Sequence, residues 1–595
     1  MRGAKALALA LGTLLSAPLA LAVPAAQAAD GDPAGGKYTV TPLAFTVQAG
    51  GRTCTVDADL YRPAGADKDH ARPAVLATNG FGGSKSDSTA AIGAAVASRG
   101  FVSLVYSGLG FGKSGCLISL DDPQIDGRAA SALIDFLAGT RTADDGTRVD
   151  YVTQDRAGDP RVGMIGGSYG GAVQMATAAV DHRVDALVPL ITWNDLAYSL
   201  DPNNVAAPEV PGAFKWQWAN GFFLIGEGQP LLEPSLDPSR INSLTCLHFT
   251  TGACDTVHTL NSGRYPADRT KAMLEYARGV SPVTYLKHVK APTLLIQGQA
   301  DTLFNLNEAE ATYRTLRAQS TPTAMIWQSW GHSGGMSDPA PGELDLAKGN
   351  LEESYTGRRI LSWFDRYLLH NKSADTGPRF AYYRDWISDP RSTYGTADSV
   401  PARSTRFYLS GDGTLVDRKS KVTQGSRSYT NLPVATSHSE SSIAGLLGLP
   451  DPQPFDTPGT YLDWSTAPLS APMDLVGSPQ LRLKVDSPAA ERTQGDSDAT
   501  GRLVLFAKLY DVAPDGGKTL VHRLVAPVRV PDVTRPFTVK LPGIVHRYEA
   551  GHKLRLVVAA SDTAYFGNKG MKRVTVTNSP SDKGDSGVLS LPVVR

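Results

Sequence analysis

The most informative segment of the sequence is Val162-Gly163-Met164-Ile165-Gly166-Gly167-Ser168-Tyr169-Gly170-Gly171-Ala172. Its apolar first half suits a buried strand, Gly-x-Ser-x-Gly follows, and small residues suited to a helix continue to Ala179. A serine on a sharp turn between a strand and a helix is typical of a nucleophile elbow. The flanking glycines would let strand and helix approach closely, and the helix N-terminus favours developing negative charge. We therefore expect Ser168 to be a nucleophile.

Strands and helices alternate on both sides of this segment. The residue pattern predicts β-structure over 38–61 and strands over 73–78, 101–106, 161–165, 186–191, 292–298 and 323–327. Between and after them it predicts helices over 88–98, 126–137, 307–317 and 351–369. Such alternation indicates an α/β fold with a mostly parallel sheet. With the elbow, it predicts an α/β-hydrolase catalytic domain over residues 37–400.

Two regions depart from this alternation. Residues from about 193 to 285 are rich in Trp, Asn and Pro, and we expect them to form a cap inserted over the strand ends, where α/β sheets bind ligands. Trp193 and Tyr198 are candidate walls of a substrate pocket there, and the alternative is that the aromatic residues of this region form the cap's own core. Past residue 400, short alternating strands recur between Pro, Gly and Asp turns. That pattern predicts an all-β sandwich domain over residues 401–595.

The charge balance and the N-terminal segment indicate which partners to exclude and where the protein is located. Lys+Arg 58 balances Asp+Glu 58, so no basic surface argues for binding nucleic acid or anionic membrane. Residues 1–28 read as a signal peptide: a charged start, an apolar run, and the cleavage pattern Ala26-Gln27-Ala28. An N-terminal membrane anchor is the alternative. We expect a secreted protein with no membrane association after cleavage.

We expect the four cysteines of an exported protein to form disulfides, because extracellular compartments are oxidising. Cys246 and Cys254 lie close together in a turn-rich segment, and we predict that they are bridged. Cys54 and Cys116 remain as a candidate second bridge. Zinc binding is the competing interpretation, but no Cys-x-x-Cys pair supports it.

A serine nucleophile needs a histidine base that is held by a carboxylate. In the α/β-hydrolase order the acid follows the elbow and the histidine comes last. Asp301 follows a predicted strand, and His332 lies in a glycine-rich loop after the next one. These positions predict Asp301 as the acid and His332 as the base. Glu308 and Glu310 read instead as the solvated face of a helix.

The oxyanion formed during acyl transfer needs hydrogen-bond donors. The amide of Tyr169 is one by the logic of the elbow, and the amide of Phe81, in a loop after an earlier strand, is the candidate second. A plain glycine turn is the alternative for that loop. The glycine-rich run 108–112 lacks a complete dinucleotide fingerprint, so no organic cofactor is expected, and none of these motifs calls for a metal.

Several of these motifs resemble those of the Xaa-Pro dipeptidyl-peptidase (S15-like) and cocaine esterase family of serine hydrolases. Residues 166–171 look like its G-x-S-Y-x-G elbow, residues 110–115 like its G-x-G-x-S-G turn, and residues 467–477 like the start of its C-terminal jelly roll. The family commonly uses a tyrosine hydroxyl as second oxyanion donor, where this chain has Phe81. Leu109 likewise stands where the family has arginine. These departures indicate a divergent branch.

The resemblance implies a serine hydrolase that acts through an acyl-enzyme on a peptide or a small ester, and the signal peptide implies that it is secreted. We expect release of Xaa-Pro dipeptides, with hydrolysis of small esters or amides as the alternative. Dipeptide release would need an anion in the cap for the substrate's ammonium group, and the candidates there are Glu209, Glu227 and Glu233. An alternative of another class is a catalytically idle protein that binds carbohydrate or a surface through the jelly roll.

Overall fold

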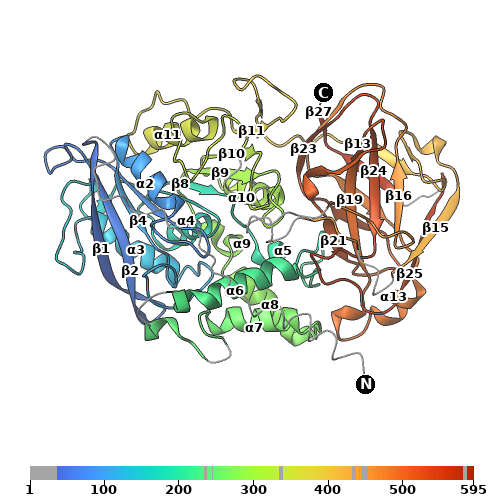
Figure 1. Ribbon diagram of the computed structural model, residues 1–595, viewed down its shortest axis with the longest axis horizontal. Coiled ribbons are helices and arrows are strands. Elements are labelled where there is room, and N and C mark those ends of the chain that lie inside the picture. The colour runs from blue at the N-terminus through green and yellow to red at the C-terminus, as the bar shows by residue number, and fades with distance from the viewer. Residues whose placement is uncertain are drawn as a thin grey trace.

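The computed structural model describes residues 36–232, 237–243, 246–333, 339–431, 437–440, 443, 453–580 and 586–594. The expected signal peptide, residues 1–28, lies outside the described residues. Figure 1 shows an α/β domain beside a β-rich domain, with helices of the cap along the lower edge of the view. The predicted fold class, an α/β-hydrolase domain with a cap followed by an all-β domain, is confirmed.

The elbow strand lies inside a ten-stranded sheet of order β1-β2-β4-β3-β7-β8-β9-β10-β11-β12. Neighbours from β4 to β11 are parallel, whereas the pairs β1–β2, β2–β4 and β11–β12 are antiparallel. The strands are β1 (Tyr38–Ala49), β2 (Arg52–Pro63), β3 (Ala74–Thr78), β4 (Val102–Tyr106), β7 (Val162–Gly167), β8 (Val184–Leu190), β9 (Thr293–Gly298), β10 (Thr323–Gln328), β11 (Phe380–Tyr383) and β12 (Tyr394–Ala397). A small hairpin, β5 (Gln154–Arg156) and β6 (Asp159–Pro160), stands apart from it.

Helices cover both faces of this sheet. Successive strand residues point to opposite faces, and apolar side chains on both faces pack against helices. On one face Leu76 belongs to an apolar cluster with Leu133 of α3 (Asp126–Leu137) and Met175 of α4 (Tyr169–Val180). On the other, Val75 belongs to a cluster that includes α2 (Ser88–Ser98) and Phe364 of α11 (Tyr355–Tyr367). The strands are therefore buried on both faces, as in parallel α/β sheets. The helix α10 (Leu306–Ala318) lies between β9 and β10 in the chain.

The cap fills the chain between β8 and β9, as the sequence predicts. Its helices are α5 (Leu196–Leu200), α6 (Trp216–Leu232), α7 (Thr251–Asn261), α8 (Ala267–Gly279) and α9 (Pro282–Tyr285), with short 3₁₀ turns η1 (Pro238–Arg240) and η2 (Leu286–His288). Trp218, Phe249 and Met273 join one apolar cluster with Tyr169 of the elbow. The cap thus packs directly over the start of α4.

The C-terminal domain consists of antiparallel sheets around one apolar core that includes Trp464 and Tyr548. It is drawn in orange and red in Figure 1. Its strands are β13 (Thr405–Leu409), β14 (Leu415–Val416), β15 (Gly425–Thr430), β16 (Tyr461–Ser465), β17 (Met473–Gly477), β18 (Gln480–Leu483), β19 (Val504–Val512), β20 (Lys518–Leu520), β21 (Ala526–Arg529), β22 (Phe537–Lys540), β23 (Ile544–Tyr548), β24 (Lys553–Ala559), β25 (Arg573–Asn578), β26 (Val588–Leu591) and β27 (Val593–Val594). It also holds the short helix α13 (Pro488–Thr493) and the 3₁₀ turns η3 (Lys419–Lys421), η4 (Ala499–Gly501) and η5 (Val521–Arg523).

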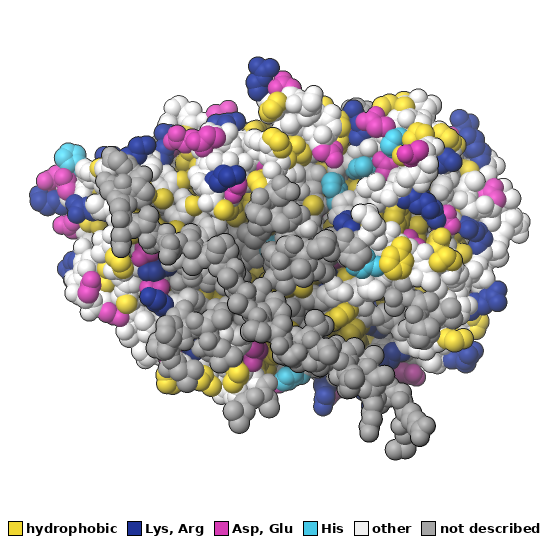
Figure 2. All heavy atoms as spheres, viewed as in Figure 1, with side chains coloured by type: hydrophobic (Ala, Val, Ile, Leu, Met, Phe, Trp, Pro, Cys, Tyr) yellow, Lys and Arg dark blue, Asp and Glu magenta, His cyan; other side chains and the backbone are white. Residues whose placement is uncertain are grey.

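Two disulfides join the four cysteines. Cys246 is bridged to Cys254, as predicted, and Cys54 is bridged to Cys116. Within the described part of the chain, no helix has the length and apolar character needed to cross a membrane. On the face seen in Figure 2, basic and acidic side chains are interspersed rather than separated by sign.

The expectation that Glu308 and Glu310 form a solvated helix face is wrong. Both side chains on α10 are buried. Glu308 accepts hydrogen bonds from the backbone N–H groups of Asn194 (2.7 Å) and Asp195 (3.1 Å), at the start of the cap. Glu310 pairs with Lys540 of the C-terminal domain at 3.0 Å. The two carboxyl groups face other parts of the protein, where their oxygens are satisfied by protein donors rather than by water.

Candidate active site

Ser168 stands between β7 and α4 in a conformation that side chains rarely adopt, with φ 56° and ψ −118°. The neighbouring glycines make this turn sterically possible. A Cβ on Gly166 would lie 2.5 Å from the carbonyl oxygen of Gly170, and one on Gly170 would lie 2.4 Å from that of Thr78. Strained backbone of this kind is typical of functional sites.

His332 contacts both of the other residues expected to work with it. Its Nε2 lies 2.9 Å from Ser168 Oγ, and its Nδ1 lies 2.7 Å from Asp301 Oδ2. The three residues follow the parallel strands β7, β9 and β10, whose carboxyl ends lie at the same edge of the sheet. All three are almost fully buried. The arrangement has the connectivity of a nucleophile, a base and an orienting acid.

The second oxygen of Asp301 is held by its own loop. Oδ1 accepts the backbone N–H groups of Leu303 (3.0 Å) and Phe304 (2.8 Å). The loops that carry Asp301 and His332 are also joined to each other, because the Thr302 amide donates to Ser333 Oγ at 2.8 Å. With both carboxylate oxygens engaged, Asp301 can hold the imidazole of His332 in one orientation.

Another histidine of the cap has a structural role. His248 is fully buried, and its ring nitrogens lie 2.7 Å from the carbonyl oxygens of Arg240 and Gly110. Burial lowers the pKa of this imidazole. Its neighbour Arg240 donates to the carbonyl oxygens of Gly110 (2.9 Å) and Gly112 (3.0 Å). The glycine-rich run 108–112 therefore anchors the cap.

The two expected oxyanion donors lie beside Ser168. A Cβ on Gly80, next to Phe81, would be 3.7 Å from Ser168 Cβ. Within the described residues, neither the Phe81 nor the Tyr169 backbone N–H donates to a partner. Tyr169 is also the first residue of α4, where the helix dipole favours negative charge. Both amides are thus available to a ligand oxygen.

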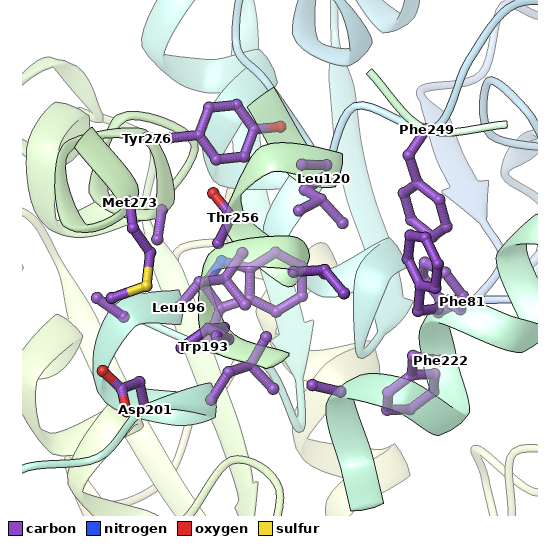
Figure 3. A pocket seen from close by; sticks show the side chains of 18 of the residues that line it. Phe81, Leu120, Trp193, Leu196, Asp201, Phe222, Phe249, Thr256, Met273 and Tyr276 are labelled. Carbon is purple, nitrogen blue, oxygen red and sulfur yellow. The ribbon is translucent and has the colours of Figure 1, made fainter. Parts of the chain in front are cut away.

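A cavity of about 110 Å³ opens beside Ser168 between the elbow and the cap (Figure 3). Its wall is almost entirely apolar and comes from α5, α6, α7, α8 and nearby loops, including Phe81, Trp193, Leu196, Phe222, Phe249 and Met273. Trp193, a candidate from the sequence, therefore lines this cavity. Tyr198 does not line this cavity; its hydroxyl donates to Asn204 Oδ1 (2.9 Å) and accepts from Asn307 (3.1 Å).

Asp201 is a lining residue that the sequence interpretation missed. It directly follows α5, and Figure 3 shows it at the edge of the group of lining side chains. Oδ2 accepts the Gly212 amide at 3.0 Å, while Oδ1 is buried with no hydrogen-bond partner. Burial raises the pKa of Asp201 to about 6, opposed by the charge of Arg529. No local motif marks this residue, because its role depends on how the cap folds.

The anion candidates proposed from sequence lie elsewhere. Glu209 is exposed and does not line the cavity. Glu227 accepts the backbone N–H groups of Leu247 (2.7 Å) and His248 (3.0 Å), so it stabilises the cap itself. Glu233 lies outside the described residues. Among the described residues that line the cavity, Asp201 is the one carboxylate. The described residues contain no cluster of three His, Cys, Asp or Glu side chains arranged to hold a metal.

Comparison with family models identifies two consecutive domains. Residues 51–334 match the X-Pro dipeptidyl-peptidase (S15 family) model. Residues 376–583 match the X-Pro dipeptidyl-peptidase C-terminal non-catalytic domain. The first match contains Ser168, Asp301 and His332, and the second begins just before β11.

Two curated relatives are candidate serine esterases of Mycobacterium bovis and Mycobacterium tuberculosis, each 24% identical over 315 residues, or 48% of this chain. The match spans about half of their length (48%). Three solved structures share the fold over almost the whole chain. The first is an aminopeptidase from a marine sediment Thaumarchaeota archaeon, with a TM-score of 0.64 and 14% identity over 94% of this chain and 96% of that one. The second is an α-amino acid ester hydrolase, with a TM-score of 0.63 and 16% identity over 97% of this chain and 100% of that one. The third is a CocE/NonD family hydrolase from Staphylococcus aureus, with a TM-score of 0.56 and 14% identity over 94% of this chain and 97% of that one.

Proposed function

Because the chain belongs to the X-Pro dipeptidyl-peptidase (S15) family, we propose that it is a serine hydrolase whose catalytic residues are Ser168, His332 and Asp301. The observation that carries this proposal is the pair of contacts made by His332, to Ser168 Oγ at 2.9 Å and to Asp301 Oδ2 at 2.7 Å. A bound carbonyl carbon would be attacked by Oγ while Nε2 takes the hydroxyl proton.

The remaining steps follow from the same geometry. The tetrahedral oxyanion would accept hydrogen bonds from the Tyr169 and Phe81 amides. Collapse of this intermediate expels the leaving group, which receives its proton from His332 and leaves an acyl group on Ser168. Water, deprotonated by the same imidazole, then releases the acid and regenerates the serine. Asp301 stabilises the imidazolium in both halves of the reaction.

The lining of the cavity indicates which chemical groups a substrate could place there. Its apolar wall suits an apolar group on the acyl side, and Asp201 supplies the one carboxylate within it. A free α-ammonium group could pair with that carboxylate, so Asp201 supports release of N-terminal Xaa-Pro dipeptides. The apolar character of the rest of the wall supports the second candidate, hydrolysis of small esters or amides without an amine.

A fluorophosphonate probe tests the reaction class. Purified protein should be labelled, and labelling should disappear in Ser168→Ala and nearly so in His332→Ala, with thermal unfolding unchanged. No labelling of the folded wild type would favour the idle binding protein. Full activity of His332→Ala would remove this histidine from the mechanism.

Three substrates then separate the candidates: Ala-Pro-p-nitroanilide, its N-acetylated form and p-nitrophenyl butyrate. Cleavage of the free-amine dipeptide alone, reduced in Asp201→Asn mainly through KM, supports the dipeptidyl-peptidase. Equal cleavage after N-acetylation would exclude an ammonium subsite. Activity confined to the ester would make the protein an esterase.

We also propose that the protein is secreted. The two disulfides support this location, because disulfides persist in oxidising compartments. Expression in the native host with fractionation of cells and medium tests it, and protein retained in the cytosol with reduced cysteines would contradict it.

A further inference from the structure

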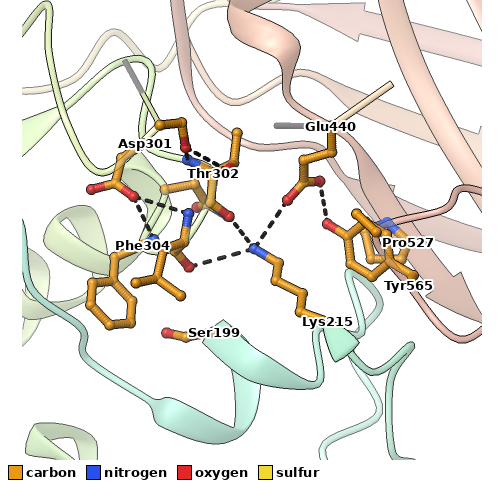
Figure 4. Close-up of polar contacts among 12 residues, drawn as sticks. Ser199, Lys215, Asp301, Thr302, Phe304, Glu440, Pro527 and Tyr565 are labelled. Carbon is orange, nitrogen blue, oxygen red and sulfur yellow. Dashed lines mark hydrogen bonds and ion pairs between the residues drawn. The ribbon is translucent and has the colours of Figure 1, made fainter. Parts of the chain in front are cut away.

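A buried lysine joins the loop of the catalytic acid to the C-terminal domain. Lys215 directly precedes α6, and its side chain is almost fully buried. Its ammonium group donates to the carbonyl oxygen of Thr302 and lies 3.5 Å from that of Leu303. It also pairs with Glu440 Oε1 at 3.4 Å, and the hydroxyl of Tyr565 donates to the other oxygen of Glu440 (Figure 4).

The carbonyls that face Lys215 belong to the same peptide groups that hold Asp301. The Thr302 carbonyl shares its peptide group with the Leu303 N–H, and the Leu303 carbonyl shares its group with the Phe304 N–H. Those two N–H groups donate to Asp301 Oδ1 at 3.0 and 2.8 Å. Figure 4 shows the two peptide groups between the ammonium and the carboxylate. A cation on the carbonyl side polarises a peptide group and strengthens its N–H as a donor.

We propose that Lys215 and Glu440 are positioning residues that act on Asp301 through these two peptide groups, so that the C-terminal domain forms part of the working active site. This inference rests on the proposed function, in which Asp301 orients His332. The polar chain runs without a break from Tyr565 and Glu440 through Lys215 and the loop to Asp301, His332 and Ser168.

Glu440 is needed because a lone buried ammonium would be costly. Burial raises the pKa of Glu440, while the charge of Lys215 and the hydrogen bond from the Tyr565 hydroxyl oppose that rise and favour the carboxylate form. The other ionisable groups near this pair are Asp562, which lies 3.5 Å from the buried Lys508, and Tyr198 of α5. Neither Asp562 nor Tyr198 hydrogen-bonds to Lys215 or Glu440 among the described contacts.

The variants Lys215→Met and Glu440→Gln should shift the pH profile of kcat/KM in opposite directions. The acid limb of this profile reports the protonation of the base in the free enzyme. Lys215→Met removes the cation beside the Thr302 and Leu303 carbonyls and weakens the donors to Asp301, so the limb should move to higher pH by about half a unit. Glu440→Gln keeps the cation but removes its counter-charge, so the limb should move to lower pH. In Lys215→Met, kcat should fall about tenfold with little change in KM, because the apolar cavity is untouched.

The matched control is Lys540→Met, which breaks another contact between a buried acid and the C-terminal domain, to Glu310 at 3.0 Å, and lies outside the Asp301 loop. Its pH profile should stay that of the wild type. Unchanged limbs in Lys215→Met and Glu440→Gln, or a fall in kcat without a shift, would overturn the proposal.

Thermal unfolding shows whether Lys215→Met folds. If it does not, the pH profile of Glu440→Gln, which keeps the shape of the side chain, tests the proposal by itself. A downward shift supports the proposal, and no shift overturns it. Labelling of the wild type by a fluorophosphonate distinguishes a failure of the positioning role of Lys215 and Glu440 from a failure of the proposed serine-hydrolase function. A labelled wild type with unshifted variants overturns only the positioning role, whereas an unlabelled, inactive wild type overturns the proposed function and this inference together.

Discussion

Gly331 lies so close to Asp301 that a Cβ on the glycine would stand 2.5 Å from Asp301 Cβ and 2.9 Å from its Oδ2. The residue that follows, His332, bonds to that same oxygen. Only a residue without a side chain lets the histidine loop approach the acid this closely. The contact between base and acid therefore depends on a glycine that takes no part in the chemistry.

Gly331→Ala should separate His332 from Asp301. We expect kcat to fall at least a hundredfold, because a base without its orienting acid loses up to about 10⁴ in rate. KM should change little, since Gly331 does not line the cavity. The control is Gly279→Ala, where an added Cβ meets nothing within 4 Å. Equal kcat values for the two variants would show that the loop can retreat without loss.

Phe81 tests whether a backbone amide acts as the second oxyanion donor. Phe81→Leu keeps the amide and an apolar side chain, so kcat should change by less than tenfold. KM should rise, because the ring packs against Phe111 and Phe222 and lines the cavity. Steady-state kinetics separate the two effects. A loss of a hundredfold or more in kcat, in a folded variant, would mean that the ring itself serves the reaction.

Local patterns predicted much of this fold. The helices at 88–98 and 126–137 begin and end where the sequence indicated, and β7, β9 and β10 lie within a residue or two of their expected bounds. The three strands are short apolar runs that begin just after a proline, and α3 has one apolar face; both features are local signals. Ser168, Asp301 and His332 could be singled out for the same reason, because each lies in the turn or loop after a predicted strand. Their catalytic roles stay predictions.

What the sequence could not indicate depends on contacts between distant segments. Strands β11 and β12 extend the main sheet, but their four-residue runs carry no alternation that distinguishes them from a loop. Glu308 looked solvated by helical period, and its partners Asn194 and Asp195 lie more than 110 residues away. The Lys215–Glu440 pair spans a still longer separation. A charged residue in a sequence reveals nothing about a buried partner that only tertiary packing supplies.

The two disulfides should differ in what they contribute to stability. Cys54 and Cys116 are 62 residues apart, whereas Cys246 and Cys254 are 8 apart. Loop-closure entropy then gives about 4 kcal/mol for the long loop and about 2.5 kcal/mol for the short one. Alanine replacement of each pair, followed by urea unfolding, measures the two losses. A larger loss for the short loop would show that contacts in the cap, and not chain entropy, dominate.

Glu308 should make stability depend on pH. Burial raises its pKa from 4.5 to about 7, even though Ser199 and the amides of Asn194 and Asp195 bond to it. The folded protein therefore holds a proton that the unfolded chain releases above about pH 4.5. The stabilisation associated with that proton is complete below the unfolded pKa and is lost as pH rises through about 7.

Glu308→Gln should remove this dependence, because the amide oxygen can accept the two backbone N–H groups while its NH₂ donates to Ser199. Relative to the variant, the wild type should lose on the order of 3 kcal/mol in free energy of unfolding between pH 4.5 and 7, with no further change above. Urea unfolding at pH 5, 6, 7 and 8 measures the difference, with Glu353→Gln, an exposed glutamate, as control. A difference that stays constant with pH, or that grows in favour of the wild type as pH rises, would mean that Glu308 is charged in the folded protein and that its three donors outweigh the cost of burying the carboxylate.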